Sequence, residues 1–219
     1  MIKFSFNDKK EVKRFIKESK IILVARNLRL NDVENIVEAV YRGGIRIIEI
    51  TMNNTEAFST IKTITEKFSD ILVGAGTVLK AGEALKAIQA GAKFLVSPIF
   101  DRKIVDSAKQ KNITVIPGAM TPTEVYFAKE YGVDMIKIFP AGILTSRFIK
   151  DLTGPFGILD IVVTGGITTE NILDFLNSGV SAVGIGKDIL NENAIKKGDY
   201  SFIEEKAKHY VDIVEKYNN

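Results

Sequence analysis

Three charged residues stand out because each lies in, or directly after, a short apolar run that has the composition of a buried strand. They are Arg26, Glu49 and Lys137. Burial among Met, Ile and Phe disfavours the ammonium form of a lysine and favours a neutral amine, which attacks carbonyl carbons. A nearby carboxylate carries protons to and from the reacting atoms. These residue types predict covalent catalysis by Lys137 with acid–base catalysis by Glu49.

Two structural interpretations compete with this chemistry. Glu49 and Lys137 would form an ion pair inside the fold, or either would point outward between helices with its charged end in water. For a single charged strand residue such an interpretation is preferred. Three such residues of complementary type, all near strand ends, favour a catalytic role instead.

The composition limits which other chemistries are available. The chain has 219 residues with no Cys and one His, and 46% of its residues are hydrophobic. This composition predicts one globular domain, residues 1–219, and excludes thiol nucleophiles, disulfides and Cys-zinc sites. A lone His209 excludes His-based triads and multi-His metal centres. We therefore expect no metal site and no cofactor.

Charge and hydropathy predict where the protein works and what it binds. The net charge is +3, from 30 basic and 27 acidic residues spread along the chain, which does not indicate a nucleic-acid surface. No run approaches the roughly 18 apolar residues of a membrane span. The first residues, MIKFSFNDKK, lack the apolar core of a signal peptide. We expect a soluble cytoplasmic protein that binds a small molecule, with no nucleic acid and no membrane as partner.

Short, β-branched apolar segments recur along the chain and alternate with helical patterns. The apolar segments are 21–25, 45–50, 71–75, 93–97, 113–117, 134–139, 158–163 and 180–186. The helical patterns are 32–41, 55–68, 80–90, 101–111, 122–131 and 169–177. This spacing predicts an α/β fold, a compact (β/α)8 TIM barrel. Lys9–Lys20, with Val12, Phe15 and Ile16 on one side, predicts an extra N-terminal amphipathic helix.

The structural alternative is an open doubly wound sheet, which is expected to have a Gly-rich first turn. Residues 26–29, which form the first turn here, contain no Gly, so the barrel is favoured. A barrel places its chemistry at the carboxyl ends of its strands. Because residues two apart in a strand share a face, Glu49 is expected to face the same side as Thr51, and Lys137 the same side as Phe139.

Glycine turns follow three of the predicted strands. They are GAGT at 74–77, TGGI at 164–167 and GIGKD at 184–188. The last two predict an anion site built from backbone N–H groups, because the loops after the last two strands of a barrel often bind phosphate. The alternative is that these glycines serve tight turns alone.

Seven motifs occur in order along most of the chain. They are IEIT (48–51), GAGTVL (74–79), VSP (96–98), IPGAMTPTE (116–124), IKIFPA (136–141), GPF (154–156) and VTGGI (163–167). With these motifs the chain resembles the 2-keto-3-deoxy-6-phosphogluconate (KDPG) / 4-hydroxy-2-oxoglutarate (KHG) aldolase family. The resemblance implies a Schiff-base (class I) lyase on a compact barrel, a homotrimer that cleaves a small-molecule keto acid and releases pyruvate.

The resemblance also implies roles for individual residues. Lys137 matches the Schiff-base lysine, and Glu49 matches the general acid/base. Thr77 matches a residue that holds the pyruvate carboxylate. The other matches are two apolar pocket walls, the arginine after the first strand, and the segment beneath the distal phosphate or polar tail: Pro98, Phe139, Arg26, Thr164, Gly165 and Gly166.

Some positions depart from the family pattern and leave the substrate open. Asn53 stands where an arginine is usual, Ile99 where a glycine is usual, and Lys187 where a phosphate-binding serine is common; Leu23 stands near the place of a usual proline. Lys187 adds a charge that pairs with an anion, whereas the neighbouring Asp188 opposes it. A phosphorylated six-carbon acid, 4-hydroxy-2-oxoglutarate and an unphosphorylated sugar acid all stay open.

Two other functions are left open by the residues. One is another phosphate-binding barrel enzyme, such as a thiamin-phosphate-synthase-like transferase, which would need acidic Mg²⁺ ligands at strand ends besides Glu49. The other is a non-catalytic or regulatory barrel that binds a sugar acid or phosphate. The presence of both Glu49 and Lys137 argues against this last function.

Overall fold

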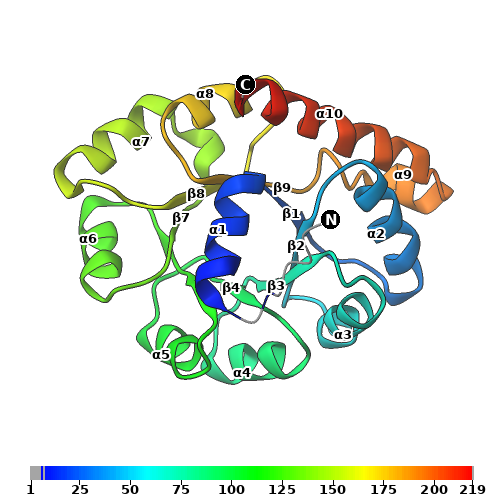
Figure 1. The fold of residues 1–219 in the computed structure, drawn as a ribbon, viewed down its shortest axis with the longest axis horizontal. Helices are drawn as coiled ribbons and strands as arrows, with labels where there is room; N and C mark the ends of the chain where they lie inside the picture. The colour runs from blue at the N-terminus through cyan, green and yellow to red at the C-terminus, as the bar shows by residue number, and fades with distance from the viewer. Residues whose placement is uncertain (1–5, 7, 219) are drawn as a thin grey trace.

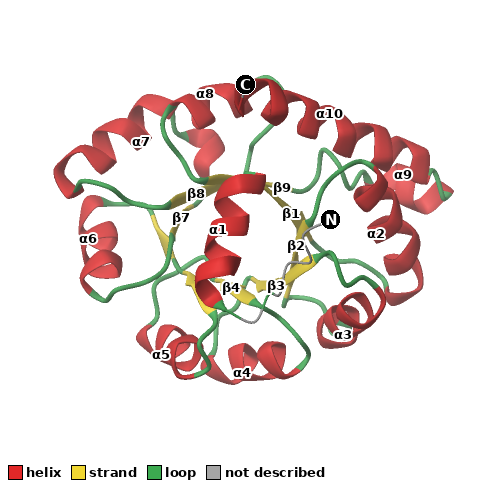
Figure 2. Ribbon diagram, viewed as in Figure 1, coloured by secondary structure: helices red, strands yellow, loops and turns green. Residues whose placement is uncertain are grey.

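The computed structural model of the chain describes residue 6 and residues 8–218. Its strands form a single parallel sheet in the order β5-β4-β3-β2-β1-β9-β8-β7-β6, which curves into a barrel (Figure 2). The strands are β1 Ile21–Ala25, β2 Ile47–Thr51, β3 Leu72–Gly76, β4 Phe94–Val96, β5 Thr114–Ile116, β6 Gly118–Ala119, β7 Ile136–Ile138, β8 Ile161–Thr164 and β9 Ala182–Ile185. The predicted TIM barrel is confirmed.

The fifth predicted strand, 113–117, corresponds to β5, and a short strand that was not predicted, β6, follows it as a second piece. Pro117 separates the two pieces, and it has no backbone N–H to donate to a neighbouring strand. β5 pairs with β4, while β6 pairs with β7. Because β5 and β6 are consecutive in the chain, this division is also where the barrel closes.

Helices surround the barrel on the outside (Figure 1). They are α2 Val33–Arg42, α3 Ala57–Lys67, α4 Ala81–Gln89, α5 Arg102–Gln110, α6 Pro122–Glu130, α7 Ser146–Thr153, α8 Ile172–Asn177, α9 Glu192–Lys197 and α10 Tyr200–Asn218. Short 3-10 turns lie at Leu30–Asp32, Ala141–Ile143 and Gly154–Phe156. The sequence patterns did not predict α7, α9 or α10. No helix among the described residues is both long and apolar enough to cross a membrane.

The predicted N-terminal helix is confirmed as α1, Lys9–Ser19, which lies across one end of the barrel (Figure 1). Its buried face carries Val12, Phe15 and Ile16, which pack on residues inside the barrel. Lys13 and Lys17 each place their Nζ 2.6 Å from an oxygen of Asp160, which directly precedes β8. Helix α1 therefore closes the amino ends of the strands and leaves their carboxyl ends open.

Alternate strand residues fill the barrel interior beneath this open end. The inward-facing layer consists of Ile22, Ile47, Leu72, Phe94, Val96, Ile116, Met135, Val162 and Ala182. Gly74 also belongs to the inner face, and a Cβ there would overlap the Phe94 ring. Two residues beyond these apolar side chains, on the same inner face, come the polar ones: Glu49 after Ile47, Lys137 after Met135 and Thr164 after Val162.

Candidate active site

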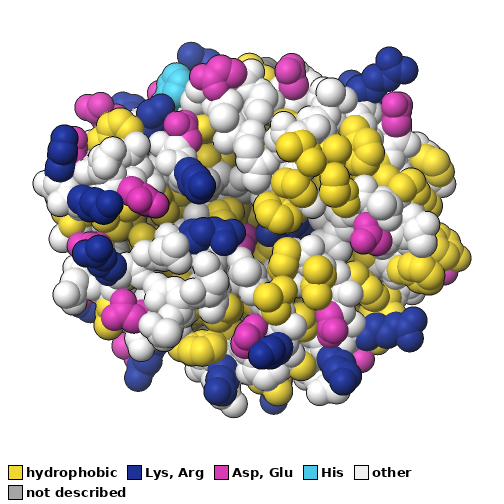
Figure 3. Space-filling model, turned by 180° about the vertical axis from the view of Figure 1, so that it is seen from behind, with side chains coloured by type: hydrophobic (Ala, Val, Ile, Leu, Met, Phe, Trp, Pro, Cys, Tyr) yellow, Lys and Arg dark blue, Asp and Glu magenta, His cyan; other side chains and the backbone are white. Residues whose placement is uncertain are grey.

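Glu49 and Lys137 are both buried inside the barrel, near the carboxyl ends of their strands. Their exposed fractions are 1% and 5%. Strands β1, β9 and β8 separate β2 from β7 in the sheet, so the two side chains approach the interior from different sides of the barrel. Figure 3 shows this open end, with a central hollow in which charged side chains are visible. The barrel therefore directs a lysine and a carboxylate into one chamber.

The Glu49 carboxylate is buried without a matching partner. Its Oε1 accepts no hydrogen bond, and among the described residues Glu49 forms no ion pair within 4.0 Å. Burial raises the pKa of this carboxyl group, while the charges of Lys137 and Arg26 act to lower it. Within the described part of the chain, no group of three or more His, Cys, Asp or Glu side chains could hold a metal ion. An unsatisfied buried carboxylate is suited to exchanging protons with a substrate or a water molecule.

Gly76 makes room for Glu49. The two residues lie on neighbouring strands, where Thr51 pairs with Gly76 and Glu49 with Gly74. A Cβ at Gly76 would overlap the carboxylate of Glu49. A side chain here would push the carboxylate out of place.

We expect Gly76→Ala to reduce kcat about as strongly as removal of the carboxylate, by ~10²–10⁴-fold, because the added Cβ displaces Glu49. The matched control is Gly82→Ala in α4, where an added Cβ meets no atom within 4 Å. That variant should keep full activity, since Ala favours a helix. Activity assays and melting temperatures of both variants check this. Full activity of Gly76→Ala would show that the carboxylate position is not critical.

Lys137 lies where β7 faces β6 on one side and β8 on the other. It pairs in register with Gly118 and with Val162. Its Nζ lies 4.9 Å from the centroid of the Phe139 ring, which is 37% exposed at the barrel mouth. A Cβ at Gly118 would overlap the backbone of Pro98, so this position next to Lys137 requires glycine. The amine is therefore reached from the open end past Phe139.

Thr77 directly follows β3 and has an unusual backbone conformation. Its φ is 54°, in the left-handed region, which is rare for a β-branched residue. Such a conformation costs on the order of 1–3 kcal/mol and is found mainly where function requires it. Its side chain is half-buried, as is that of Pro98 after β4. Both residues lie in turns at the open end of the barrel.

The turn after β8 contains the glycines that the sequence predicted as part of an anion site. Gly165 and Gly166 have φ values of 84° and 78°, which favour glycine. The Gly142 N–H donates to the Gly165 oxygen at 2.6 Å. Thr164 differs from its two neighbours because it is 3% exposed inside the barrel, where its Oγ1 has no hydrogen-bond partner among the described residues. The sequence grouped these three residues, but the structure divides them between chamber and mouth.

The charged residues at the barrel mouth differ in their exposure and in their ion-pair partners. Lys187 is exposed after β9, and among the described residues it has no ion-pair partner. Asp188 does not turn toward Lys187: its Oδ2 accepts from the Tyr210 hydroxyl at 2.7 Å and lies 3.5 Å from Lys206 Nζ. Arg26 is exposed after β1, near enough to act on Glu49. The ammonium group of Lys187 is therefore not paired with Asp188 and can bind an anion.

Asn53 belongs to a second, uncharged part of the mouth. Its Nδ2 donates to Asn27 Oδ1 at 3.4 Å, which links the turns after β2 and β1. Asn27 also has a positive φ, 56°. These amides donate hydrogen bonds without carrying a charge.

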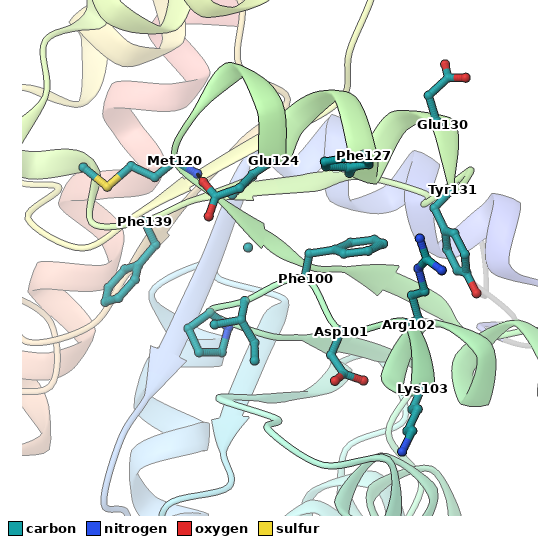
Figure 4. Close-up of a pocket in the computed structure, with 14 residues that line it drawn as sticks. Phe100, Asp101, Arg102, Lys103, Met120, Glu124, Phe127, Glu130, Tyr131 and Phe139 are labelled. Carbon is teal, nitrogen blue, oxygen red and sulfur yellow. Dashed lines mark hydrogen bonds between the residues drawn. The ribbon is translucent and has the colours of Figure 1, made fainter.

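A groove of about 850 Å³ leaves the barrel mouth between α5 and α6. Figure 4 shows Phe139 at one end, Phe100 near the middle, and Tyr131 with Arg102 at the other end. Ile99, 47% exposed, also lines it. No sequence pattern predicted this groove. The segment that could have indicated the groove is α6, PTEVYFAKE. Its apolar residues lie on both the buried and the exposed sides of the helix.

Comparisons with known proteins match this chain over most of its length. A protein-family model described as KDPG and KHG aldolase matches residues 12–206. The 2-dehydro-3-deoxy-phosphogluconate aldolase of Treponema pallidum is 32% identical over 89% of this chain and 93% of its own length. A Legionella pneumophila KDPG aldolase, solved with pyruvate captured as a covalent carbinolamine intermediate, is 30% identical. The match has a TM-score of 0.82 and covers 90% of this chain and 96% of that one.

A more distant likeness concerns the fold alone. Thiamine phosphate pyrophosphorylase from Pyrococcus furiosus is 18% identical, with a TM-score of 0.64 over 88% of this chain and 98% of its own. That enzyme shares the barrel with this chain. At this identity the likeness carries no statement about activity.

Proposed function

Because this chain belongs to the KDPG and KHG aldolase family and is a class I aldolase, a carbon–carbon lyase, we propose that it cleaves a KDPG- or KHG-type acid. The products are pyruvate and an aldehyde, either glyceraldehyde 3-phosphate or glyoxylate, and the reaction is reversible. The observation that carries this proposal is the buried Glu49 carboxylate, whose Oε1 has no hydrogen-bond partner among the described residues and which faces the same chamber as the buried Lys137. The chamber supplies a nucleophile and a proton carrier together.

Lys137 and Glu49 divide the chemistry between them. The Lys137 amine attacks C2 of the ketone, and loss of water from the carbinolamine, assisted by Glu49, gives an iminium ion. Glu49 then takes the proton of the C4 hydroxyl, directly or through water. The C3–C4 bond breaks, the aldehyde leaves, and the bonding electron pair moves into the iminium to give an enamine. Protonation at C3 and addition of water then release pyruvate and regenerate the amine.

The remaining mouth residues bind the two ends of the acid in this proposal. Thr77 holds the pyruvate carboxylate, while Pro98 and Phe139 form the apolar walls on either side of the pyruvyl group. Thr164 meets the reacting end from inside the barrel. The distal phosphate or carboxylate is bound by exposed donors and cations: Arg26, Gly165, Gly166 and Lys187.

The identity of the distal group is tested with Lys187→Ala. If Lys187 meets a phosphate, the variant should lose an extra ~1.5–3 kcal/mol in kcat/KM on the phosphorylated acid relative to the unphosphorylated one. Lys150→Ala, which removes an exposed lysine from α7, is the matched control and should change neither value. Equal losses on both acids, or none, would remove Lys187 from the site and leave the glycine amides as the anchor.

We propose that the working form is a homotrimer, supported by an apolar face beside the active site. On α6, Tyr126 and Phe127 are 48% and 53% exposed, and Ile143 nearby along the mouth is 74% exposed. Figure 3 shows apolar side chains gathered on one side of the open end. Apolar groups gathered in this way are typical of surfaces that another protein covers.

Phe127→Asp should shift the protein from trimer to monomer in analytical ultracentrifugation, because a buried, unpaired charge opposes association. Leu173→Asp is the matched control: Leu173 is 43% exposed on α8 and should leave the trimer intact. A monomeric parent protein, or a Phe127→Asp variant that stays trimeric, would contradict the assignment of this face.

We also propose that residues 1–219 work as one domain in the cytoplasm. All described strands belong to a single sheet. The proposed substrates are charged acids, which do not cross an apolar membrane unaided. The enzyme is then expected in the compartment where such acids are made.

A further inference from the structure

We propose that Tyr210 is a positioning residue that sets the two anion-binding turns at the barrel mouth. Tyr210 acts from α10, on the side of the loops that faces away from the substrate, and does not contact the substrate. The turns are Gly165–Gly166 after β8 and Gly186–Asp188 after β9. This inference deepens the proposed function and rests on it, since it concerns how a phosphorylated acid is held at its distal end.

The first contact of Tyr210 is with the turn after β9. Tyr210 lies in α10 and is 0% exposed. Its hydroxyl donates to Asp188 Oδ2 at 2.7 Å, and Lys206 from the same helix places its Nζ 3.5 Å from that oxygen. The carboxylate of Asp188 is therefore fastened to α10 by a phenol and an ammonium group. Asp188 directly follows Lys187, so fixing one fixes the backbone of the other.

The second contact is with the loop after β8. The backbone of Thr169 lies close enough to the Tyr210 hydroxyl to act on its pKa. Two hydrogen bonds of Asn171 fold the start of this loop: its Nδ2 donates to the Gly166 oxygen at 2.9 Å, and its Oδ1 accepts from the Thr168 N–H at 2.9 Å. The buried phenol oxygen therefore binds Asp188 after β9 and lies beside the backbone of the loop after β8.

The electrostatics of this bridge leave Lys187 free for a ligand. Burial, followed by donation to Asp188, raises the pKa of Tyr210, so its hydroxyl stays a donor. The negative charge of Asp188 is offset by Lys206 rather than by Lys187. Among the described residues Lys187 has no ion pair. The bridge therefore separates an acidic residue from the cation beside it.

Removing the phenol oxygen should let the two turns move relative to each other. The chamber that contains Glu49 and Lys137 should stay intact. Misplacement of a binding group by about 1 Å can cost as much as 10²-fold in rate. The loss should fall on the substrate whose distal phosphate spans both turns. A substrate that ends before the turns should be unaffected, because Lys137 and Glu49 belong to β7 and β2.

The test is Tyr210→Phe in the full chain, assayed with KDPG and with the same acid lacking its phosphate. We expect KM for KDPG to rise by roughly 10- to 100-fold, with kcat within a factor of about three and with no change on the unphosphorylated acid. Tyr217→Phe is the matched control. It removes another α10 hydroxyl, one that donates to the Leu176 oxygen at 3.0 Å, and should change neither KM whatever its melting temperature. Asp188→Asn, which keeps an acceptor for Tyr210 but loses the charge paired with Lys206, should raise KM for KDPG less than Tyr210→Phe.

Trapping of pyruvate on Lys137 with borohydride separates this inference from the proposed function. If the parent and Tyr210→Phe are both labelled, the chamber works in both proteins. Equal effects of Tyr210→Phe on both acids, no effect on either, or a parent that shows no preference for KDPG would then overturn the positioning role alone. A parent that is not labelled would overturn the proposed function and this inference together.

Discussion

Lys137→Ala is expected to lower kcat by on the order of 10⁵–10⁶-fold, the scale of loss when a covalent nucleophile is removed. Without the amine no iminium forms, so the electron pair released from the C3–C4 bond has no acceptor. Lys137 is 5% exposed and surrounded by barrel residues. The variant removes a buried polar group and leaves space rather than a clash, so the barrel should still fold.

The measurement is steady-state turnover with pyruvate release, with circular dichroism to verify folding. Lys150→Ala, an exposed lysine variant in α7, should match the parent. Turnover of Lys137→Ala within tenfold of the parent would mean that another group carries the covalent step, or that the reaction has none.

Glu49→Gln is expected to reduce kcat by ~10²–10⁴-fold, because glutamine keeps the shape but cannot carry a proton. Binding of pyruvate should persist, so this variant should lose kcat rather than gain a large KM. The matched control is Glu66→Gln, an exposed glutamate of α3 that is 64% exposed in its side chain. A loss of no more than a few-fold in Glu49→Gln would make Glu49 structural.

The pH dependence follows from the same carboxylate. Burial raises the pKa of Glu49 above 4.5, while Lys137 and Arg26 oppose the increase. The deprotonated form accepts the C4 hydroxyl proton. The value of kcat/KM should therefore be highest above the raised pKa and should decrease as the pH falls through it. Arg26→Gln removes one opposing charge and should move this acid limb to higher pH. A limb that stays unchanged in Glu49→Gln would belong to a different group.

Much of the barrel could be predicted because its strands bury both faces. Apolar runs such as 45–50 and 71–75 carry that signal in consecutive residues. The short strand β6 after Pro117 was not predicted, since it depends on how the barrel closes. Helix α10 was also missed: its inner face is formed by widely spaced residues such as Ile203 and Tyr210 within a strongly charged segment.

The residues proposed to carry the chemistry were easier to predict than the residues that position them. Glu49 and Lys137 are visible in the sequence because a charge inside an apolar run is costly without a purpose. Gly76 was predicted only as part of a glycine turn, and Tyr210 was not singled out, because their contacts run across the sheet or between loops. The same holds for Thr164, whose burial inside the barrel is not evident from its place beside two mouth glycines.

The most direct test of the account is borohydride trapping with pyruvate, followed by peptide mass mapping. Incubation of the protein with pyruvate forms the iminium on the reactive lysine, and borohydride reduces it to a stable secondary amine. We predict one added pyruvyl-derived mass per chain, located on the peptide that contains Lys137 and absent from Lys137→Ala. Labelling of a different lysine, or undiminished labelling in Lys137→Ala, would contradict the account.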